Sequence, residues 1–235
     1  MKRALVLSSG GVDSTTCVGI AVQDVGKDNV TTVSVYYGQK HKKELDCADA
    51  IAKHYGVDHR IIDLSKTGIM DGSACPLLEA SGKDIPEKSY AEQIAENGEG
   101  MVTTYVPFRN GLILSSVAAM AMAIYPEDEV DIYLGAHADD AAGEAYADCS
   151  EAFTDAMGLA ISIGTYGKVQ LKAPLVNLNK AGVVKIGLEL GVPYELTWSC
   201  YNGGDRPCGK CGTCIDRAAA FEANGVADPA LKEED

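Results

Sequence analysis

The amino-acid sequence predicts an α/β protein, in which a parallel sheet carries helices on both faces. The first 64 residues alternate between short apolar or β-branched runs and segments with helical periodicity, joined by short links. That alternation favours parallel strands connected by right-handed crossovers. The 235 residues, 46% of them hydrophobic and 23% charged, suffice for one sizeable core with a small appendage. We therefore expect a single domain over residues 1–235.

The first half of the chain contains three predicted strands and two predicted helices, assigned from hydrophobic periodicity and from the glycines that follow the helices. The strands are expected at 4–7, 30–36 and 57–64, and the helices at 14–25 and about 40–55. Residues 66–100 break this pattern with five glycines and two prolines. A loop of this length in a compact domain is usually functional or disordered, and we interpret it as an active-site lid.

The second half is predicted to alternate in the same way. Strands are expected at 103–106, 130–135 and 169–173, and helices at 112–124, 150–161 and 180–190. The helix at 112–124 is apolar on nearly all sides and is therefore predicted to be buried. Arg109 and Asn110 stand directly before it. Asn110 could be a plain helix N-cap beside a surface arginine, or the pair could belong to a site.

The turn at residues 8–14 is the strongest functional signal, because it follows the first strand directly. Ligands of parallel sheets bind at the carboxyl ends of strands. We expect Gly10 and Gly11 to adopt positive φ and to let a ligand approach the backbone, while Ser9 and Ser14 supply hydroxyl groups. A helix begins there, and its unpaired N–H groups attract anions. The turn is therefore predicted to bind a phosphate or a pyrophosphate, although serine and glycine are also common in ordinary strand–helix turns.

Two well-known phosphate loops do not fit this turn. The glycines are adjacent, so the dinucleotide pattern G-x-G-x-x-G fails, and the turn has no lysine, so G-x-x-x-x-G-K-[ST] fails. The segment SGGVDS resembles instead the pyrophosphate loop (PP-loop) of the N-type ATP pyrophosphatases. Residues 204–210 match the start of the second pattern, but Cys211 replaces its serine or threonine and no strand precedes it.

Four cysteines near the C-terminus have metal-ligand spacing. Cys200, Cys208, Cys211 and Cys214 follow the pattern C-x7-C-x2-C-x2-C, with glycines between them that allow tight turns. Four thiolates suit a closed, structural Zn²⁺ site, which we assign to a segment at 197–222. An iron–sulfur cluster would use the same ligands, and a redox C-x-x-C pair is a second alternative.

Composition limits the partners of the chain. The formal net charge is −14 and the pI about 4.6, which argues against non-specific binding to nucleic acid or to an anionic membrane. The sequence shows neither an apolar stretch of transmembrane length nor a signal peptide. We expect a cytoplasmic protein. After the strand at 130–135, His137, Asp139 and Asp140 could hold Mg²⁺ or a polar substrate, and the two aspartates could equally cap the next turn.

Taken together, these segments resemble the 7-cyano-7-deazaguanine synthase family almost from end to end. The matching pieces are SGGVDSTTC, YGQKH, TYVPFRN, GAHADD, ADC, TWSCY and CGKCGTC. The resemblance implies a Rossmann-like sheet of the adenine nucleotide alpha hydrolase type and a homodimer. It also implies an ATP-dependent ligase that converts 7-carboxy-7-deazaguanine and ammonia into the nitrile preQ0, through an adenylated acid and an adenylated amide. AMP and pyrophosphate would leave, and Mg²⁺ would assist.

The resemblance also implies roles for individual residues. Ser9, Asp13, Ser14 and Arg109 are expected to be catalytic. Substrate contacts are expected from Arg109, Asn110, His137, Asp140 and Asp148. ATP contacts are expected along the whole run Leu7, Ser8, Ser9, Gly10, Gly11, Val12, Asp13, Ser14, Thr15, Thr16 and Cys17.

The chain departs from the family pattern between Asp140 and Ser150. The family usually reads DYSGYPDCR, whereas residues 140–150 of this chain read DAAGEAYADCS, with two extra residues and a serine in place of the arginine. Substrate choice is therefore open at this segment. The alternatives are another PP-loop enzyme, such as one that modifies tRNA, and a nucleotide-binding module without catalysis. A strongly acidic chain is poorly equipped to hold tRNA.

Overall fold

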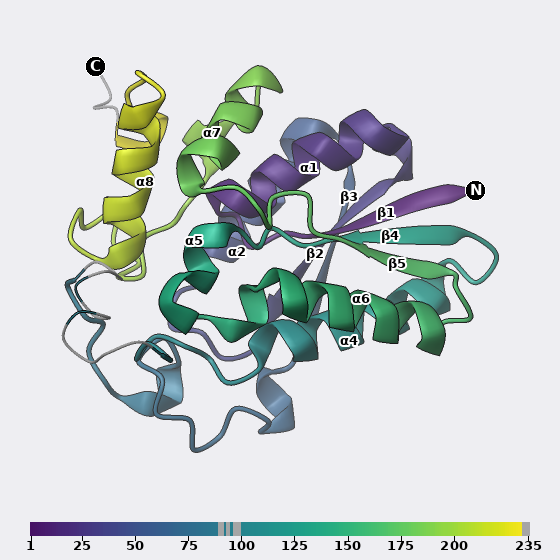
Figure 1. Cartoon of the computed structure of the whole chain (residues 1–235), viewed down its shortest axis with the longest axis horizontal. Helices are drawn as coiled ribbons and strands as arrows, with labels where there is room; N and C mark the ends of the chain where they lie inside the picture. The colour runs from purple at the N-terminus through teal and green to yellow at the C-terminus, as the bar shows by residue number, and fades with distance from the viewer. Residues whose placement is uncertain (89–91, 93–94, 96–99, 232–235) are drawn as a thin grey trace.

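The computed structural model describes residues 1–88, 92, 95 and 100–231 (Figure 1). Within these residues the chain forms a five-stranded sheet with the order β3-β2-β1-β4-β5, in which every pairing is parallel. The predicted parallel α/β sheet is thus confirmed. The strands are β1 (Lys2–Leu7), β2 (Val30–Tyr36), β3 (Asp58–Asp63), β4 (Glu129–Tyr133) and β5 (Val169–Lys172).

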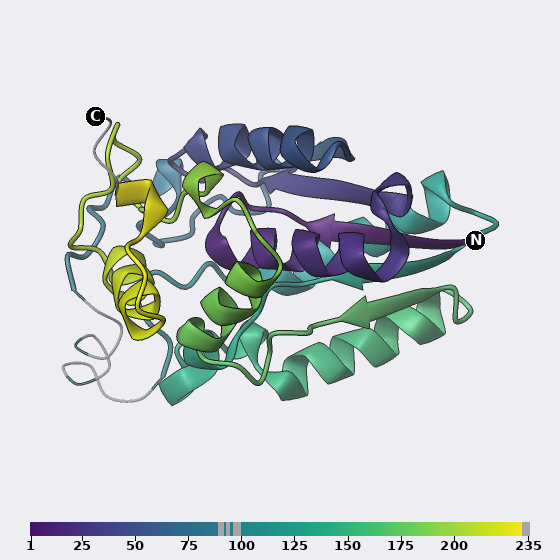
Figure 2. The ribbon, with the colours of Figure 1, turned by 90° about the horizontal axis from the view of Figure 1, so that it is seen from above.

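Helices cover both faces of the sheet. One face carries α1 (Val12–Val25), α2 (Lys43–Tyr55) and α7 (Lys180–Glu189), and the other carries α4 (Arg109–Ile124) and α6 (Glu151–Gly164) (Figures 1 and 2). Side chains of a strand point alternately to the two faces. In β1, accordingly, Leu5 packs in the core beside α4, whereas Val6 packs in the core beside α1 and α7.

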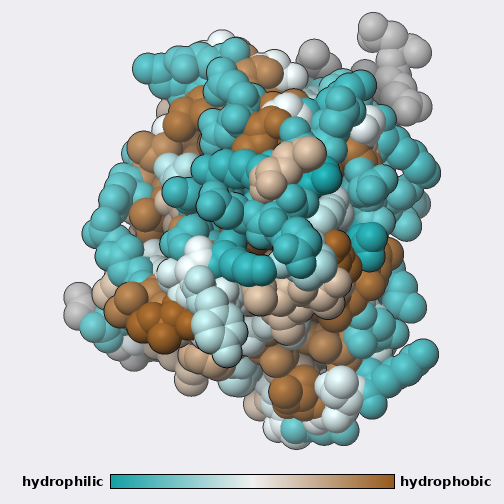
Figure 3. All heavy atoms as spheres, turned by 90° about the vertical axis from the view of Figure 1, so that its right-hand side faces the viewer, coloured by the Kyte–Doolittle hydropathy of each residue, from teal (hydrophilic) through white to brown (hydrophobic). Residues whose placement is uncertain are grey.

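The carboxyl ends of the strands all point to one side of the molecule. The short helix α5 (Ala138–Ala141), the helix α8 (Gly212–Ala223) and the segment that follows β3 lie at this side (Figure 1). The opposite side, with the N-terminus, is mainly hydrophilic in its middle (Figure 3). Short 3₁₀ turns lie at Lys27–Asn29, Ser65–Thr67, Glu79–Ser81, Ala142–Glu144, Ala147–Cys149, Tyr194–Leu196 and Pro229–Leu231.

The predicted strand at 103–106 is wrong, because these residues form a turn and an extended segment outside the sheet. Thr104 is buried there by loop contacts rather than by a neighbouring strand. Its hydroxyl lies 2.5 Å from the hydroxyl of Tyr146, and its carbonyl accepts a hydrogen bond from the Cys75 thiol. β-branched residues favour strands because their side chains pack well on a half-buried surface. Here contacts with other loops provide this burial, and no strand forms.

Helix α4 begins at Arg109, three residues before its predicted start. Its N-cap is Phe108, in the left-handed region with φ 51°, so Asn110 lies inside the first turn and is not the N-cap. The Asn110 N–H donates instead to the Asp148 carboxylate at 2.9 Å. The carboxylate that accepts from the first turn of α4 lies 38 residues further along the chain, so no neighbouring residue signals it. For this reason the hydrophobic periodicity placed the start of the helix too late.

The segment predicted as a lid lies beside the carboxyl ends of the strands. Leu78 pairs with Gln39 in an isolated antiparallel bridge, and the Lys40 N–H donates to the Leu77 carbonyl at 2.9 Å. Residues 89–91, 93–94 and 96–99 of the predicted lid lie outside the described part, and its lid role stays a prediction. Across the residues described, no helix is both long and apolar enough to cross a membrane.

Candidate active site

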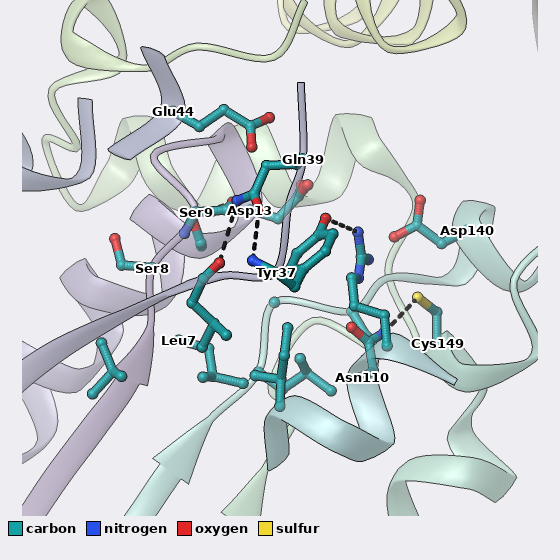
Figure 4. Close-up of a pocket in the computed structure, with 18 of the residues that line it drawn as sticks. Leu7, Ser8, Ser9, Asp13, Tyr37, Gln39, Glu44, Asn110, Asp140 and Cys149 are labelled. Atoms are coloured by element: carbon teal, nitrogen blue, oxygen red, sulfur yellow. Dashed lines mark hydrogen bonds between the residues drawn. The ribbon is translucent and has the colours of Figure 1, made fainter. Parts of the chain in front are cut away.

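Two adjoining cavities open at the carboxyl ends of β1, β2 and β4, with volumes of about 220 and 170 Å³ (Figure 4). The first extends over the apolar ends of the strands, and the second extends toward α7 and the cysteine segment. The residues that line both cavities, and so mark their junction, are Ser9, Asp13, Glu44, Arg109, Asp140 and Cys149. The predicted loop therefore lies at the edge where the fold places ligands.

The phosphate loop, which we define as residues 8–14, closes on itself through its serines. The Ser9 N–H donates to Ser14 Oγ at 3.2 Å, and the two hydroxyl oxygens also lie 3.2 Å apart. Helix α1 starts at Val12, with Gly11 as N-cap, and no side chain caps its first N–H groups. Uncapped N–H groups at a helix start, beside two hydroxyl groups, form an anion site.

The two glycines of the loop have different roles. Gly10 has φ +77°, and a Cβ there would lie 2.3 Å from the Glu44 carbonyl oxygen, so this glycine lets α2 pack against the loop. Gly11 has φ −87°, which corrects our expectation of positive φ, and a Cβ there would meet nothing closer than Ser9 Oγ at 3.4 Å. Only Gly11 therefore leaves the backbone open to a ligand.

Asp13 is held by a lysine that the sequence reasoning missed. The Nζ of Lys180, the first residue of α7, lies 2.7 Å from Asp13 Oδ1. His137 Nε2 lies 3.4 Å from Lys180 Nζ and 3.4 Å from Asp140 Oδ2, so the four side chains form one cluster. Burial opposes ionisation of Asp13, but the nearby Lys180 ammonium outweighs it and lowers the pKa of this carboxyl. Burial raises the pKa of Asp140.

Arg109 reaches the junction of the cavities from the start of α4. Its guanidinium donates to the Tyr37 hydroxyl at 3.3 Å and makes no ion pair within the described residues. It is therefore placed to meet an anionic ligand. Asn110 lines the first cavity, and its side-chain amide lies 3.3 Å from Cys149 Sγ (Figure 4). The same amide donates to the Asp148 carbonyl at 2.9 Å.

The cavities do not reach every residue that was expected to contact a ligand. Asp148 is 4% exposed and lines neither cavity, because its carboxylate holds the start of α4. Thr15, Thr16 and Cys17 lie on the buried side of α1. Thr16, for example, hydrogen-bonds the Tyr194 hydroxyl at 2.8 Å in the core. Residues of the predicted loop line the two cavities, whereas Thr15, Thr16 and Cys17 do not, and the ligand contacts themselves stay a prediction.

The four predicted cysteines come together at the start of α8. The sulfur atoms of Cys200, Cys208, Cys211 and Cys214 all lie within 4.8 Å of one another, and all four are free thiols. Backbone N–H groups donate to these sulfurs, as from Cys208 to Cys200 Sγ at 3.3 Å. Hydrogen bonds, above all from the Cys214 thiol, lower the pKa of the Cys211 thiol. The donor set thus fits one metal ion with tetrahedral thiolate ligands.

The cysteine segment touches the phosphate loop directly. The backbone N–H of Trp198 donates to the Gly10 carbonyl at 2.8 Å. The Nζ of Lys43, in α2, lies over the Trp198 ring, 3.7 Å from its centroid. Farther along, Arg217 of α8 forms a buried ion pair with Asp228 at 2.7 Å and donates to the Thr197 hydroxyl. The C-terminal segment is therefore packed against the phosphate loop and α2.

The fold and the site define an α/β protein with a parallel sheet, an uncapped helix start at the end of its first strand and a four-cysteine cluster. The chain belongs to the family described as queuosine biosynthesis protein QueC, whose model matches residues 3–225. It is similar to the 7-cyano-7-deazaguanine synthase of Archaeoglobus fulgidus, with 39% identity over 99% of this chain and 91% of that one. It is also similar to the enzyme of the same name from Caldicellulosiruptor saccharolyticus, with 41% identity over 97% of this chain and 94% of that one.

Among solved structures, the NMN synthetase of Francisella tularensis matches with a TM-score of 0.49 and 16% identity. The match covers 96% of this chain and 77% of that one.

Proposed function

We propose that this protein converts 7-carboxy-7-deazaguanine and ammonia into 7-cyano-7-deazaguanine at the expense of ATP, which is released as AMP and pyrophosphate. The main supporting observation is the uncapped start of α1 beside a cavity that Arg109 also lines. Arg109 makes no ion pair within the described residues, and relatives of the family carry this enzyme name. A carboxylate reacts poorly with ammonia because hydroxide is a poor leaving group. Transfer of AMP to the acid supplies a better one.

In this proposal ATP occupies the first cavity. Leu7 at the end of β1, Val33 within β2 and Leu134 just after β4 line it and would offer an apolar wall to the adenine ring. The β- and γ-phosphates would then lie against Ser9, Gly11 and Ser14. Backbone N–H groups and hydroxyls there stabilise the charge that develops on departing pyrophosphate. Mg²⁺ would add further positive charge to the phosphates, with Asp13 or Asp140 as the carboxylates nearest to them.

The acid substrate fits the second cavity, next to the same junction. Arg109 would neutralise the carboxylate or the α-phosphate, since its guanidinium lines both cavities. His137 and Asp140 line the second cavity and would contact polar groups of the substrate, and Asn110 would contact it from the first. For Asp148 we propose a positioning role, because its carboxylate fixes the first turn of α4 and thereby Arg109.

The segment in which the chain departs from its family forms two 3₁₀ turns, Ala142–Glu144 and Ala147–Cys149. Ser150, which replaces the typical arginine, is the N-cap of α6 and accepts a hydrogen bond from the Phe153 N–H at 3.2 Å. This position therefore offers the substrate no positive charge. We propose that Arg109 alone supplies the positive charge on this side of the cavity.

For the four-cysteine centre we propose zinc with a structural role. A closed set of four thiolates leaves no open coordination position for chemistry. Such an ion would fix the turns that carry Trp198 to the phosphate loop. Its chemical contribution would be to stabilise the fold, and no step of the reaction needs it.

We further propose a cytoplasmic homodimer without a bound nucleic acid. Leu159, Ile163 and Tyr166 at the end of α6 are 63%, 70% and 91% exposed, which leaves apolar surface available for a second copy. The sheet end with the N-terminus also shows hydrophobic residues on the side of α4 and α6 (Figure 3). The net charge of −14 supports the absence of nucleic acid.

One incubation tests the proposed function. The purified protein is mixed with ATP, ammonia and 7-carboxy-7-deazaguanine, and the products are identified by mass spectrometry. AMP together with the nitrile is expected. Release of ADP, or ATP that is bound and not consumed, would overturn the proposal, and the second result would favour a nucleotide-binding module. A shift of tRNA in a native gel would favour a tRNA-modifying enzyme instead.

A further inference from the structure

Glu44, in the first turn of α2, differs from the other acids of the site. Asp13 is paired with Lys180, and Asp140 lies 3.4 Å from His137. The half-buried Glu44 carboxylate makes neither an ion pair nor a hydrogen bond within the part of the chain that the structure describes. It lines both cavities, and Figure 4 shows it across the cavity from Asp140.

The position of Glu44 is fixed by its helix. The Glu44 carbonyl lies against Gly10, where the absence of a Cβ lets α2 approach the phosphate loop. The side chain is therefore held beside the point at which the phosphates and the acid substrate meet. Many charged and titratable groups share its cavities. They are Asp13 of α1, Tyr37 after β2, Lys40 and His41 before α2, Arg109 of α4, His137, Asp140 of α5, Tyr146, Cys149, Lys180 of α7, Cys200, Tyr201 and Asp216 of α8, with Cys47 nearby on α2.

The proposed reaction needs a base at this point. Ammonium must lose one proton before its nitrogen attacks the acyl carbon of the adenylated acid. A second proton leaves as the C–N bond forms and the C–O bond to AMP breaks. The amide oxygen then bonds to the α-phosphorus of a second ATP and releases pyrophosphate. Two further protons leave nitrogen as the C–O bond breaks and the nitrile forms, so all four hydrogens of ammonium depart as protons.

We infer that Glu44 is the catalytic residue that accepts protons from the reacting nitrogen. The inference rests on the proposed function and deepens it. Asp13 is engaged by Lys180, and Asp140 is engaged by His137. All three acids line both cavities, but among the described residues only Glu44 has a carboxylate with neither an ion pair nor a hydrogen bond; the Arg109 guanidinium acts on it only from a distance. Burial raises the pKa of Glu44 to about 7, which suits a group that takes and releases protons near neutral pH.

The test separates adenylation from the steps at nitrogen. A carboxylate attacks the α-phosphorus without losing a proton, so Glu44→Gln should retain exchange of labelled pyrophosphate into ATP that depends on the acid. Formation of amide and nitrile from ammonia should fall about 100-fold or more. Hydroxylamine is mostly unprotonated at neutral pH, and it should restore hydroxamate formation in the variant. Asp46→Asn, on the exposed side of α2, is the matched control and should behave as wild type.

Each result has one meaning. If Glu44→Gln makes nitrile from ammonia at the wild-type rate, the inference is wrong. If it instead raises the KM for the acid in the exchange assay and hydroxylamine restores nothing, Glu44 binds the substrate and does not accept protons, which also overturns the inference. If Glu44→Gln alters the melting temperature, Glu44→Asp is tested in its place. Glu44→Asp should slow the steps that use ammonia and leave the exchange of pyrophosphate into ATP unchanged. If the wild-type protein shows no exchange, the proposed function itself fails.

Discussion

Lys180 Nζ lies 2.7 Å from Asp13 Oδ1, so the first residue of α7 neutralises a carboxylate in the first turn of α1. The two residues are separated by 167 positions in the sequence. The pair lies beside the phosphate loop, and in the proposed reaction it would set the charge that departing pyrophosphate meets.

Replacing Lys180 with methionine should lower both stability and activity. The substitution leaves the largely buried Asp13 carboxylate without its partner, at a cost of about 2 kcal/mol. Acid-dependent exchange between pyrophosphate and ATP should fall about 100-fold. Thermal unfolding and the exchange assay measure the two effects. Lys185→Met, an exposed site on the same helix, should change neither, and equal losses in both variants would contradict a specific role for Lys180.

Replacing Asp13 with asparagine keeps the shape of the side chain and removes its charge. AMP formation should be lost, because the loop loses the carboxylate that orients Lys180 and that could hold Mg²⁺. Chromatographic measurement of AMP checks this. Full turnover in the variant would remove Asp13 from the mechanism.

Alanine substitutions at the two loop glycines should affect two different properties, the stability of the protein and its affinity for ATP. Gly10→Ala adds a Cβ at 2.3 Å from a backbone oxygen of α2 and at a positive φ, so we expect a loss of about 3 kcal/mol in unfolding free energy. Gly11→Ala has space and ordinary φ, and it should fold normally while binding ATP more weakly. Denaturant titration and calorimetry distinguish the two. A Gly11→Ala protein with wild-type ATP affinity would show that the phosphates do not approach this backbone.

Replacing Cys211 with serine should remove the metal and destabilise the C-terminal segment. Elemental analysis of the wild-type protein should find about one zinc per chain, and the variant should bind far less and unfold at a lower temperature. Cys75→Ser is the control, since this buried thiol lies apart from the four-cysteine cluster. Iron with visible absorbance in the wild-type protein would identify an iron–sulfur cluster instead of zinc.

The rate of amide formation should depend on pH through Glu44. Burial raises the pKa of this carboxyl to about 7, so the group is protonated and inactive as a base below that pH and becomes active above it. The wild-type rate should therefore rise about tenfold per pH unit below pH 7 and level off above it. The exchange of pyrophosphate into ATP should not show this rise below pH 7. Stability should depend on pH in the opposite sense. The folded state binds the proton of Glu44 more tightly than the unfolded state does, so the stability that this group contributes falls as the pH rises from about 4.5 to 7.

The sequence predicted the features whose signals are local. The sheet and the four-cysteine cluster each depend on residues close together in the chain, and both are confirmed. The phosphate loop also has a local signal, and its role stays a prediction. Lys180 and Glu44 were missed because each is an ordinary charged residue in a helical pattern, and only the fold brings it to residues 8–14. The start of α4 and the false strand at 103–106 failed for the same reason, since Asp148 and Tyr146 act on them from a distance.

The hydrogen bond from Trp198 to the Gly10 carbonyl has a consequence for synthesis of the protein. Residues 2–25, which form β1 and α1, are synthesised before residues 180 and 198, so the loop between them lacks two of its contacts until those residues have been made. If this loop binds phosphate as proposed, we expect nucleotide binding only in chains that extend beyond residue 198.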